Sequence, residues 1–181
     1  MLVDAMLKDG VAGRIASAPS LRAVYQELRS WPLLGPFMAY QLAIDLNYSP
    51  LISFSENDFT MPGPGALRGI HKVFTDIGSR SPSDVVFWLV DQQDEVRDDF
   101  GLTPPTLFGR KLHAIDCQNL LCEVDKYCRA AHPRLLSNRS AIKQRYVHDP
   151  TRFRFMFPPD WQLEEPIPDQ WRARVGDLAF V

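Results

Sequence analysis

The segment Leu28–Leu46 constrains the fold most, because it reads as two helices joined by a tight turn. The turn Trp31–Pro36 contains two prolines and Gly35, and a run of small and apolar residues follows it. In a hairpin of this kind, backbone amides at the start of the second helix can face an anion. The sequence therefore predicts a pair of helices with an anion-binding end near Gly35.

The rest of the chain also reads as helical, with proline-rich connections. Apolar residues at helical spacing predict helices around residues 21–28, 37–46, 66–75, 84–98 and 106–131. Ser20 is the predicted N-cap of the first helix, and Pro133 is predicted to end the last one. Met61–Gly65 is predicted to be a shaped loop, because it contains two prolines and two glycines. We therefore expect an all-α fold.

Composition fits a single globular domain, since 45% of the 181 residues are hydrophobic and 23% are charged. No run of about 18 apolar residues is present, so no membrane span is expected. The N-terminus carries acids where a signal peptide would carry bases, so we expect an intracellular protein, cytoplasmic or nuclear. We expect a helical domain over residues 1–149. Prolines alternate with aromatic residues in 150–181, and we expect this irregular segment to wrap over the helices.

Charge is distributed unevenly along the chain. Residues 84–99 contain six acids and one base, whereas residues 126–154 contain eight bases and one acid. The basic block matches the electrostatic pattern of phosphate contact, although a solvated surface balanced by nearby acids is the alternative. Cys117, Cys122 and Cys128 fall on different sides of one predicted helix, so no disulfide is expected. No CxxC or histidine pair accompanies them, and no metal site is predicted.

Three acidic or amide residues are candidates for chemistry. Gln41 and Asp45 are four residues apart and share one face of an otherwise apolar helix. A carboxylate there is expected to be paired, hydrogen-bonded or raised in pKa. Such an acid is either a structural partner or a general base that reads an extruded base. Asp58 follows Gly35 by about one helix and a loop, and is either a loop residue or a catalytic carboxylate.

Candidates for phosphate binding lie on two later segments. Gly63 and Gly65 open a predicted helix and Arg68 follows, which suits a phosphate, although a rigid turn gives the same pattern. The segment is not a P-loop, because no Gly-Lys-Ser/Thr follows. The 106–131 helix has a polar side opposite its apolar one. That side is either a solvated face or the wall of a cleft, and its members are Asp116, Asn119, Glu123, Lys126 and Tyr127.

Three ordered blocks, Gly35–Tyr48, Pro62–Gly69 and Asp116–Tyr127, resemble one family. It is the helical domain of the DNA-base hypermodification proteins, which include 5-hydroxymethyl-deoxyuridine DNA kinases and alpha-glutamyl/putrescinyl thymine pyrophosphorylases. The family is similar to the helix–hairpin–helix DNA glycosylases, whose hairpin the pattern around Pro32 and Gly35 also resembles. The resemblance implies a helical bundle with that fold.

The resemblance also implies a function on 5-hydroxymethyluracil or modified thymine in DNA, with phosphoryl or pyrophosphoryl transfer chemistry. Together with the spacing, it gives as catalytic candidates Gln41, Asp45, Asp58, Glu123 and Lys126. Together with the charge pattern, it gives as DNA or phosphate contacts Gly35, Gly63, Gly65, Arg68, Tyr127 and Arg129. The base pocket is expected between the Gln41/Asp45 helix and the Glu123/Tyr127 helix. Implied partners are DNA and a separate kinase or upstream domain, with ATP and Mg²⁺ if a phosphoryl group is transferred.

Two other functions stay open at this stage. A monofunctional helix–hairpin–helix glycosylase would use Asp58 against an oxocarbenium-like state and would release a free base without needing a nucleotide. A noncatalytic module would bind DNA or a partner kinase and leave the bases unchanged.

Overall fold

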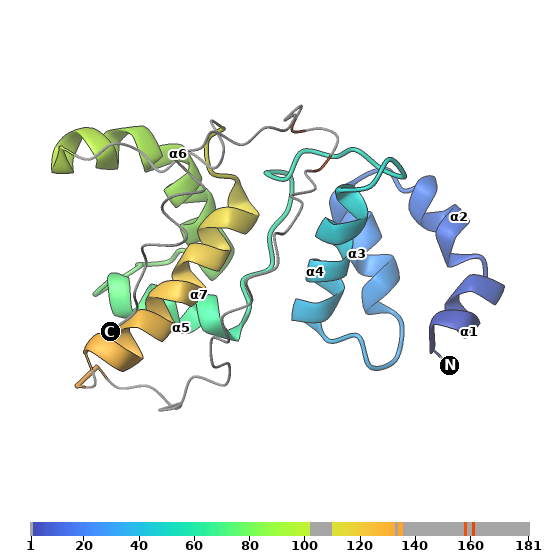
Figure 1. Ribbon diagram of the computed structural model, residues 1–181, viewed down its shortest axis with the longest axis horizontal. Helices are drawn as coiled ribbons and strands as arrows, with labels where there is room; N and C mark the ends of the chain where they lie inside the picture. The colour runs from blue at the N-terminus through green and yellow to red at the C-terminus, as the bar shows by residue number, and fades with distance from the viewer. Residues whose placement is uncertain (1, 102–109, 133, 136–157, 159–160, 162–181) are drawn as a thin grey trace, which may run out of the picture.

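The computed structural model describes residues 2–101, 110–132, 134–135, 158 and 161. All regular structure within these residues is helical, and they contain no β-sheet, so the prediction of an all-α fold is confirmed (Figure 1). The helices are α1 (Leu2–Lys8), α2 (Val11–Ala16), α3 (Leu21–Arg29), α4 (Pro36–Asn47), α5 (Pro64–Val73), α6 (Pro82–Phe100) and α7 (Ala114–Ala131). None of these helices has the length and apolar character needed to cross a membrane.

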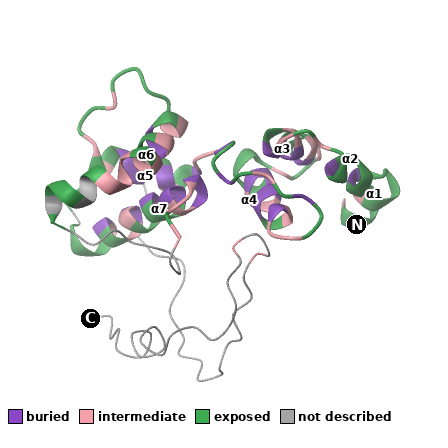
Figure 2. Cartoon of the chain, turned by 90° about the horizontal axis from the view of Figure 1, so that it is seen from above, coloured by how far each residue is buried: buried purple, intermediate pink, exposed green. Residues whose placement is uncertain are grey.

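The first four helices form one group, in which α3 and α4 pack against each other as predicted. The Ser20 hydroxyl accepts a hydrogen bond from the Ala23 amide at 3.2 Å and so caps α3. The two helices share a core in which Leu21 and Val24 of α3 and Tyr40 of α4 are fully buried. By contrast, α1 buries none of its residues (Figure 2).

In the turn between α3 and α4, the residue with a left-handed backbone is Leu33 and not Gly35. Gly35 is extended, with φ −67° and ψ 168°, and a Cβ added there would meet nothing within 4 Å. Leu33 instead has φ 70°, in the left-handed region, and its side chain is 90% exposed. Gly35 is therefore the N-cap of α4 and is not the residue that makes the turn tight.

The second group contains α5, α6 and α7, and its closest contact is between α5 and α7. Two glycines of α5 allow this approach. A Cβ on Gly69 would lie 2.0 Å from the Leu121 carbonyl oxygen, and a Cβ on Gly65 would lie 2.3 Å from Cys122 Sγ. Both positions therefore need glycine so that the helices can meet.

Several predicted boundaries differ from the observed ones. The loop predicted over Met61–Gly65 ends two residues earlier in the structure. Pro64 is the first residue of α5, a position where proline is well tolerated. The helix predicted from residue 106 is seen from Ala114 on, and residues 102–109 lie outside the described part. α1 and α2 were not predicted. α7 ends at Ala131, just before Pro133, as expected, and its three cysteines are free thiols.

Residues 48–63 connect the two groups of helices (Figure 1). The groups also touch directly, because Ile115 of α7 packs into the core formed by α2, α3 and α4. The predicted irregular segment 150–181 lies outside the described residues, apart from Pro158 and Trp161. Both of these lie beside the connection between the two groups, at the cavity described next.

Candidate functional site

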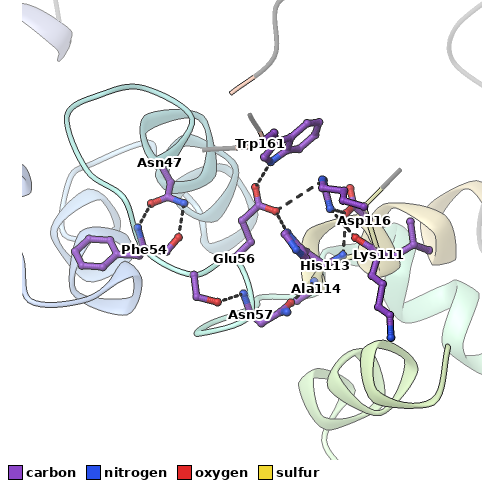
Figure 3. A network of polar contacts seen from close by, with 12 residues as sticks. Asn47, Phe54, Glu56, Asn57, Lys111, His113, Ala114, Asp116 and Trp161 are labelled. Carbon is purple, nitrogen blue, oxygen red and sulfur yellow. Dashed lines mark hydrogen bonds and ion pairs between the residues drawn. The ribbon is translucent and has the colours of Figure 1, made fainter. Parts of the chain in front are cut away.

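Asn47, the last residue of α4, determines the course of the segment that follows. Its Nδ2 donates to the Phe54 carbonyl at 2.9 Å, and its Oδ1 accepts from the Phe54 amide at 2.8 Å (Figure 3). These two bonds fold the loop so that Glu56 and Asn57 reach the N-terminus of α7. Asn57 Oδ1 accepts from the Ala114 amide at 2.9 Å, which satisfies one of the unpaired amides of that helix end.

Glu56 is the centre of a buried charge network at this helix end, which we call the Glu56 cluster (Glu56, Arg110, His113, Asp116 and Trp161). Glu56 Oε2 contacts His113 Nδ1 and lies 3.8 Å from Arg110 Nη2. Its Oε1 accepts from Trp161 Nε1 at 3.4 Å. Asp116 accepts from Arg110 Nη1 at 2.8 Å and from the His113 amide at 2.9 Å. Arg110 and the α7 N-terminus offset the cost of holding two carboxylates away from water.

A cavity of about 260 Å³ opens beside the Glu56 cluster, between the end of α4 and the start of α7. The rings of Tyr48 and Trp161 line it and meet edge to face, with centroids 5.7 Å apart. The Arg110 guanidinium lies 3.8 Å from the centroid of the Trp161 ring. Burial raises the pKa of the Tyr48 phenol, and the nearby Glu56 carboxylate adds to the shift. Tyr48 is therefore a neutral wall of this cavity.

The ligand atoms of Glu56, His113 and Asp116 lie within 4.8 Å of one another, a spacing that could hold a metal ion. However, Arg110 forms ion pairs with both carboxylates and already supplies a positive charge. A divalent cation would have to compete with this guanidinium, so we assign no metal to these residues.

A second polar network joins α5 to α7, and we call it the Asp125 cluster (Asp125, Arg68, Lys72 and Arg129). The Asp125 side chain is 1% exposed and accepts from Lys72 Nζ at 2.6 Å and from Arg68 Nε at 3.0 Å. Arg129 Nη2 lies 3.6 Å from the same carboxylate. Desolvation alone would raise the pKa of Asp125, but hydrogen bonds from Lys72 and Arg68 outweigh it and lower the pKa. Three cations thus face one anion.

The Asp125 cluster brings together two predicted phosphate contacts, Arg68 and Arg129, from helices far apart in sequence. Other predicted residues of α7 lie nearby on its surface. Glu123 and Lys126 form the expected ion pair three residues apart, and the hydrogen bond to Glu123 raises the pKa of Lys126. The Tyr127 side chain is 63% exposed.

The two glycines predicted to bind phosphate at the start of α5 already have contacts within the protein. The Gly63 amide is buried and donates to Gln118 Oε1 at 3.1 Å, so it already has a partner within the protein. Gly65 lies against Cys122. The expectation that a Gly63–Gly65 loop exposes its amides is therefore wrong at Gly63. The contact between α5 and α7 explains Gly65, whereas a Cβ on Gly63 would lie 2.4 Å from Phe37 Cδ2 of α4.

The expectation that Asp45 is a carboxylate buried in an apolar helix is also wrong. Asp45 is exposed, because α4 turns Ala43 and Ile44 toward the core instead. Asp58 is exposed as well. Gln41 is half-buried, and its Nε2 is buried with no hydrogen-bond partner among the described residues. The cavity between α4 and α7 is lined by residues other than those predicted.

The residues at the centre of the two networks, Asp125 and Glu56, were not predicted from the sequence. Asp125 had a readable signal, because it shares the apolar side of α7 with Leu121 and Cys128 and is buried there like them. Glu56 had no comparable signal, since it lies in an irregular segment and its partner His113 is 57 residues away.

The described residues form an all-helical domain in which cationic side chains hold two buried carboxylates. Asp125 is held between α5 and α7, and Glu56 is held beside the N-terminus of α7. Residues 1–137 match the family described as "5-hmdU DNA kinase, helical domain", and the chain belongs to this family. The predicted resemblance is thus confirmed.

One curated relative supports this assignment. The "5-hmdU DNA kinase" of Bacillus phage SP10 is 27% identical over 115 residues, which cover 60% of this chain and 18% of the phage protein. The chain therefore matches a minor part of the length of that relative. No solved structure matches the chain, so the likeness to helix–hairpin–helix glycosylases has no structural support.

Proposed function

We propose that this chain is the DNA-holding helical part of a system that modifies 5-hydroxymethyluracil in DNA, acting with a linked kinase domain. Its family and its phage relative support the connection to this modified base. The observation that carries the proposed DNA contact is the Asp125 cluster, where three cationic side chains converge on one buried carboxylate.

The Asp125 cluster suits a phosphate because Asp125 holds one side of the Arg68 guanidinium in place and leaves part of this side chain at the surface. Arg68 is the member best placed for contact, since its side chain is 21% exposed and only its Nε bonds to Asp125. A guanidinium has five N–H donors, so its terminal nitrogens can donate to a phosphate oxygen. Tyr127, exposed on α7, adds an aromatic surface for a nucleotide.

In this proposal the phosphoryl or pyrophosphoryl transfer, with its ATP and Mg²⁺, is the task of the linked kinase part. The catalytic roles of Gln41, Asp45, Asp58, Glu123 and Lys126 remain predictions. Nucleosides from hydroxymethyluracil-containing DNA, incubated with the chain with and without ATP, can be analysed by mass spectrometry. We expect no new nucleoside. An ATP-dependent product would make the chain itself catalytic, and a free base would favour a glycosylase.

The binding step is tested by the Arg68→Gln variant in fluorescence anisotropy titrations with a hydroxymethyluracil-containing duplex. Loss of one phosphate contact should weaken binding and make the slope of log affinity against log salt shallower by about 1. Lys8→Gln, an exposed lysine on α1, is the matched control and should change neither. Equal behaviour of Arg68→Gln and wild type would contradict the assignment of the Asp125 cluster.

A further inference from the structure

The cavity beside the Glu56 cluster has the features of a site for a planar, single-ring ligand. Its volume of about 260 Å³ is below the range of roughly 300–1,000 Å³ typical of pockets for drug-sized molecules. Aromatic rings from two distant segments, Tyr48 and Trp161, form part of its wall. Tyr48 lies within residues 1–137 that match the family, whereas Trp161 lies beyond them.

Two contacts position the Trp161 ring in this wall. Trp161 is fixed by its hydrogen bond to Glu56 and by the Arg110 guanidinium stacked at 3.8 Å from its ring centroid. A ring that is held on one face by a guanidinium is a ready platform for an unstacked base, since every nucleobase offers a flat π-face. The rings therefore favour a base over an aliphatic ligand.

The polar groups of the site add a more selective requirement. Glu56 is a buried acceptor whose two oxygens face the cluster, and Figure 3 shows its carboxylate directed toward Trp161 and His113. Arg110 stacks on the Trp161 ring and its Nη2 lies 3.8 Å from Glu56 Oε2, so it supports the wall and does not line the cavity. Glu56 and His113 do line the cavity, and they are the titratable groups that a ligand can reach there together with the Tyr48 phenol.

We infer that this cavity receives an extruded pyrimidine of the uracil type, whose edge presents an N–H flanked by two carbonyl oxygens. Glu56, which lines the cavity, accepts from the ring N–H, and a ring N–H of His113 donates to a neighbouring carbonyl oxygen. Cytosine fits less well, because its ring nitrogen is an acceptor where Glu56 also needs a donor. The inference rests on the proposed function for the source of the base, since a base in a duplex must leave the stack to enter a pocket.

The experiment uses a short duplex with one 5-hydroxymethyluracil and 2-aminopurine as its neighbour, whose fluorescence rises when stacking is lost. The variants are Glu56→Gln, which removes the anionic acceptor, and Trp161→Phe, which keeps a ring but loses the indole N–H. Trp88→Phe is the matched control, because Trp88 lines a different cavity next to Phe74. Circular dichroism checks that each variant is folded, and anisotropy gives its affinity for the duplex.

We expect wild type and Trp88→Phe to raise the 2-aminopurine signal equally. Glu56→Gln and Trp161→Phe should each need roughly tenfold more protein for the same signal, with duplex affinity changed less than about twofold. Free 5-hydroxymethyldeoxyuridine in excess should reverse the signal. Wild-type binding with no signal, or variants that match wild type, would overturn the pocket and leave the proposed function standing. Absence of duplex binding would instead remove the proposed function and this inference with it.

Discussion

A single carboxylate, that of Asp125, shows how one residue can fix the contact between two helices. It is fully buried and bonds to Lys72 and Arg68 across the α5–α7 contact, while Arg129 approaches from its own helix. A buried charge with several partners becomes costly when one partner is removed. Asp125 is therefore the residue at which a small change should have the largest effect on stability.

Asp125→Ala should lower the free energy of unfolding by about 3 kcal/mol, because it leaves three cations without their anion at a buried contact. Urea denaturation followed by circular dichroism measures this value. Asp91→Ala, at an exposed position of α6, is the control and should change stability by less than about 0.5 kcal/mol. A similar loss in both variants would show that the Asp125 cluster contributes little.

The lowered pKa of Asp125 also predicts a dependence of stability on pH. A carboxylate with a lower pKa in the folded state stabilises the protein above its unfolded pKa of about 4, and this contribution disappears as pH falls through the folded value. Unfolding free energies measured from pH 7 down to pH 3 should therefore fall more steeply for wild type than for Asp125→Asn. Parallel curves would mean that Asp125 titrates normally.

Among the helices, the α5–α7 pair shows what sequence periodicity can and cannot predict. Apolar spacing located α3, α4, α5, α6 and α7, because each has enough regularly spaced apolar residues to form a core face. α1 and α2 escaped detection, since α1 buries none of its residues and α2 spans six residues. The close contact at Gly69 also could not be predicted, because it depends on a helix more than forty residues away.

Gly69→Ala should destabilise the protein by about 3 kcal/mol, since its Cβ would meet the rigid backbone of α7 at Leu121 and force the two helices apart. Gly13→Ala is the control on α2, where an added Cβ meets nothing within 4 Å. That change should raise stability by roughly 0.5–1 kcal/mol through helix propensity. Thermal denaturation of both variants tests the pair. Equal shifts would contradict the close packing of α5 on α7.

At the scale of the whole molecule, the connection 48–63 joins the two helical groups. It carries Glu56 from the end of α4 to the start of α7, where the cavity lies. A base pocket between α4 and α7 stays a prediction, and the cavity found there is lined by residues other than the predicted ones. Helix spacing identifies faces of single helices, whereas Glu56, Arg110 and Trp161 meet only because the chain folds back on itself.

The central claim is that this helical chain holds hydroxymethyluracil-containing DNA by its cationic contact between α5 and α7. The most direct test is the affinity of the full chain for such a duplex, measured by anisotropy over a range of salt concentrations. We expect a slope of log affinity against log salt of about −1 or steeper, because the partly exposed Arg68 guanidinium contacts one DNA phosphate. Affinity that does not change with salt, or no binding at low salt, would contradict it.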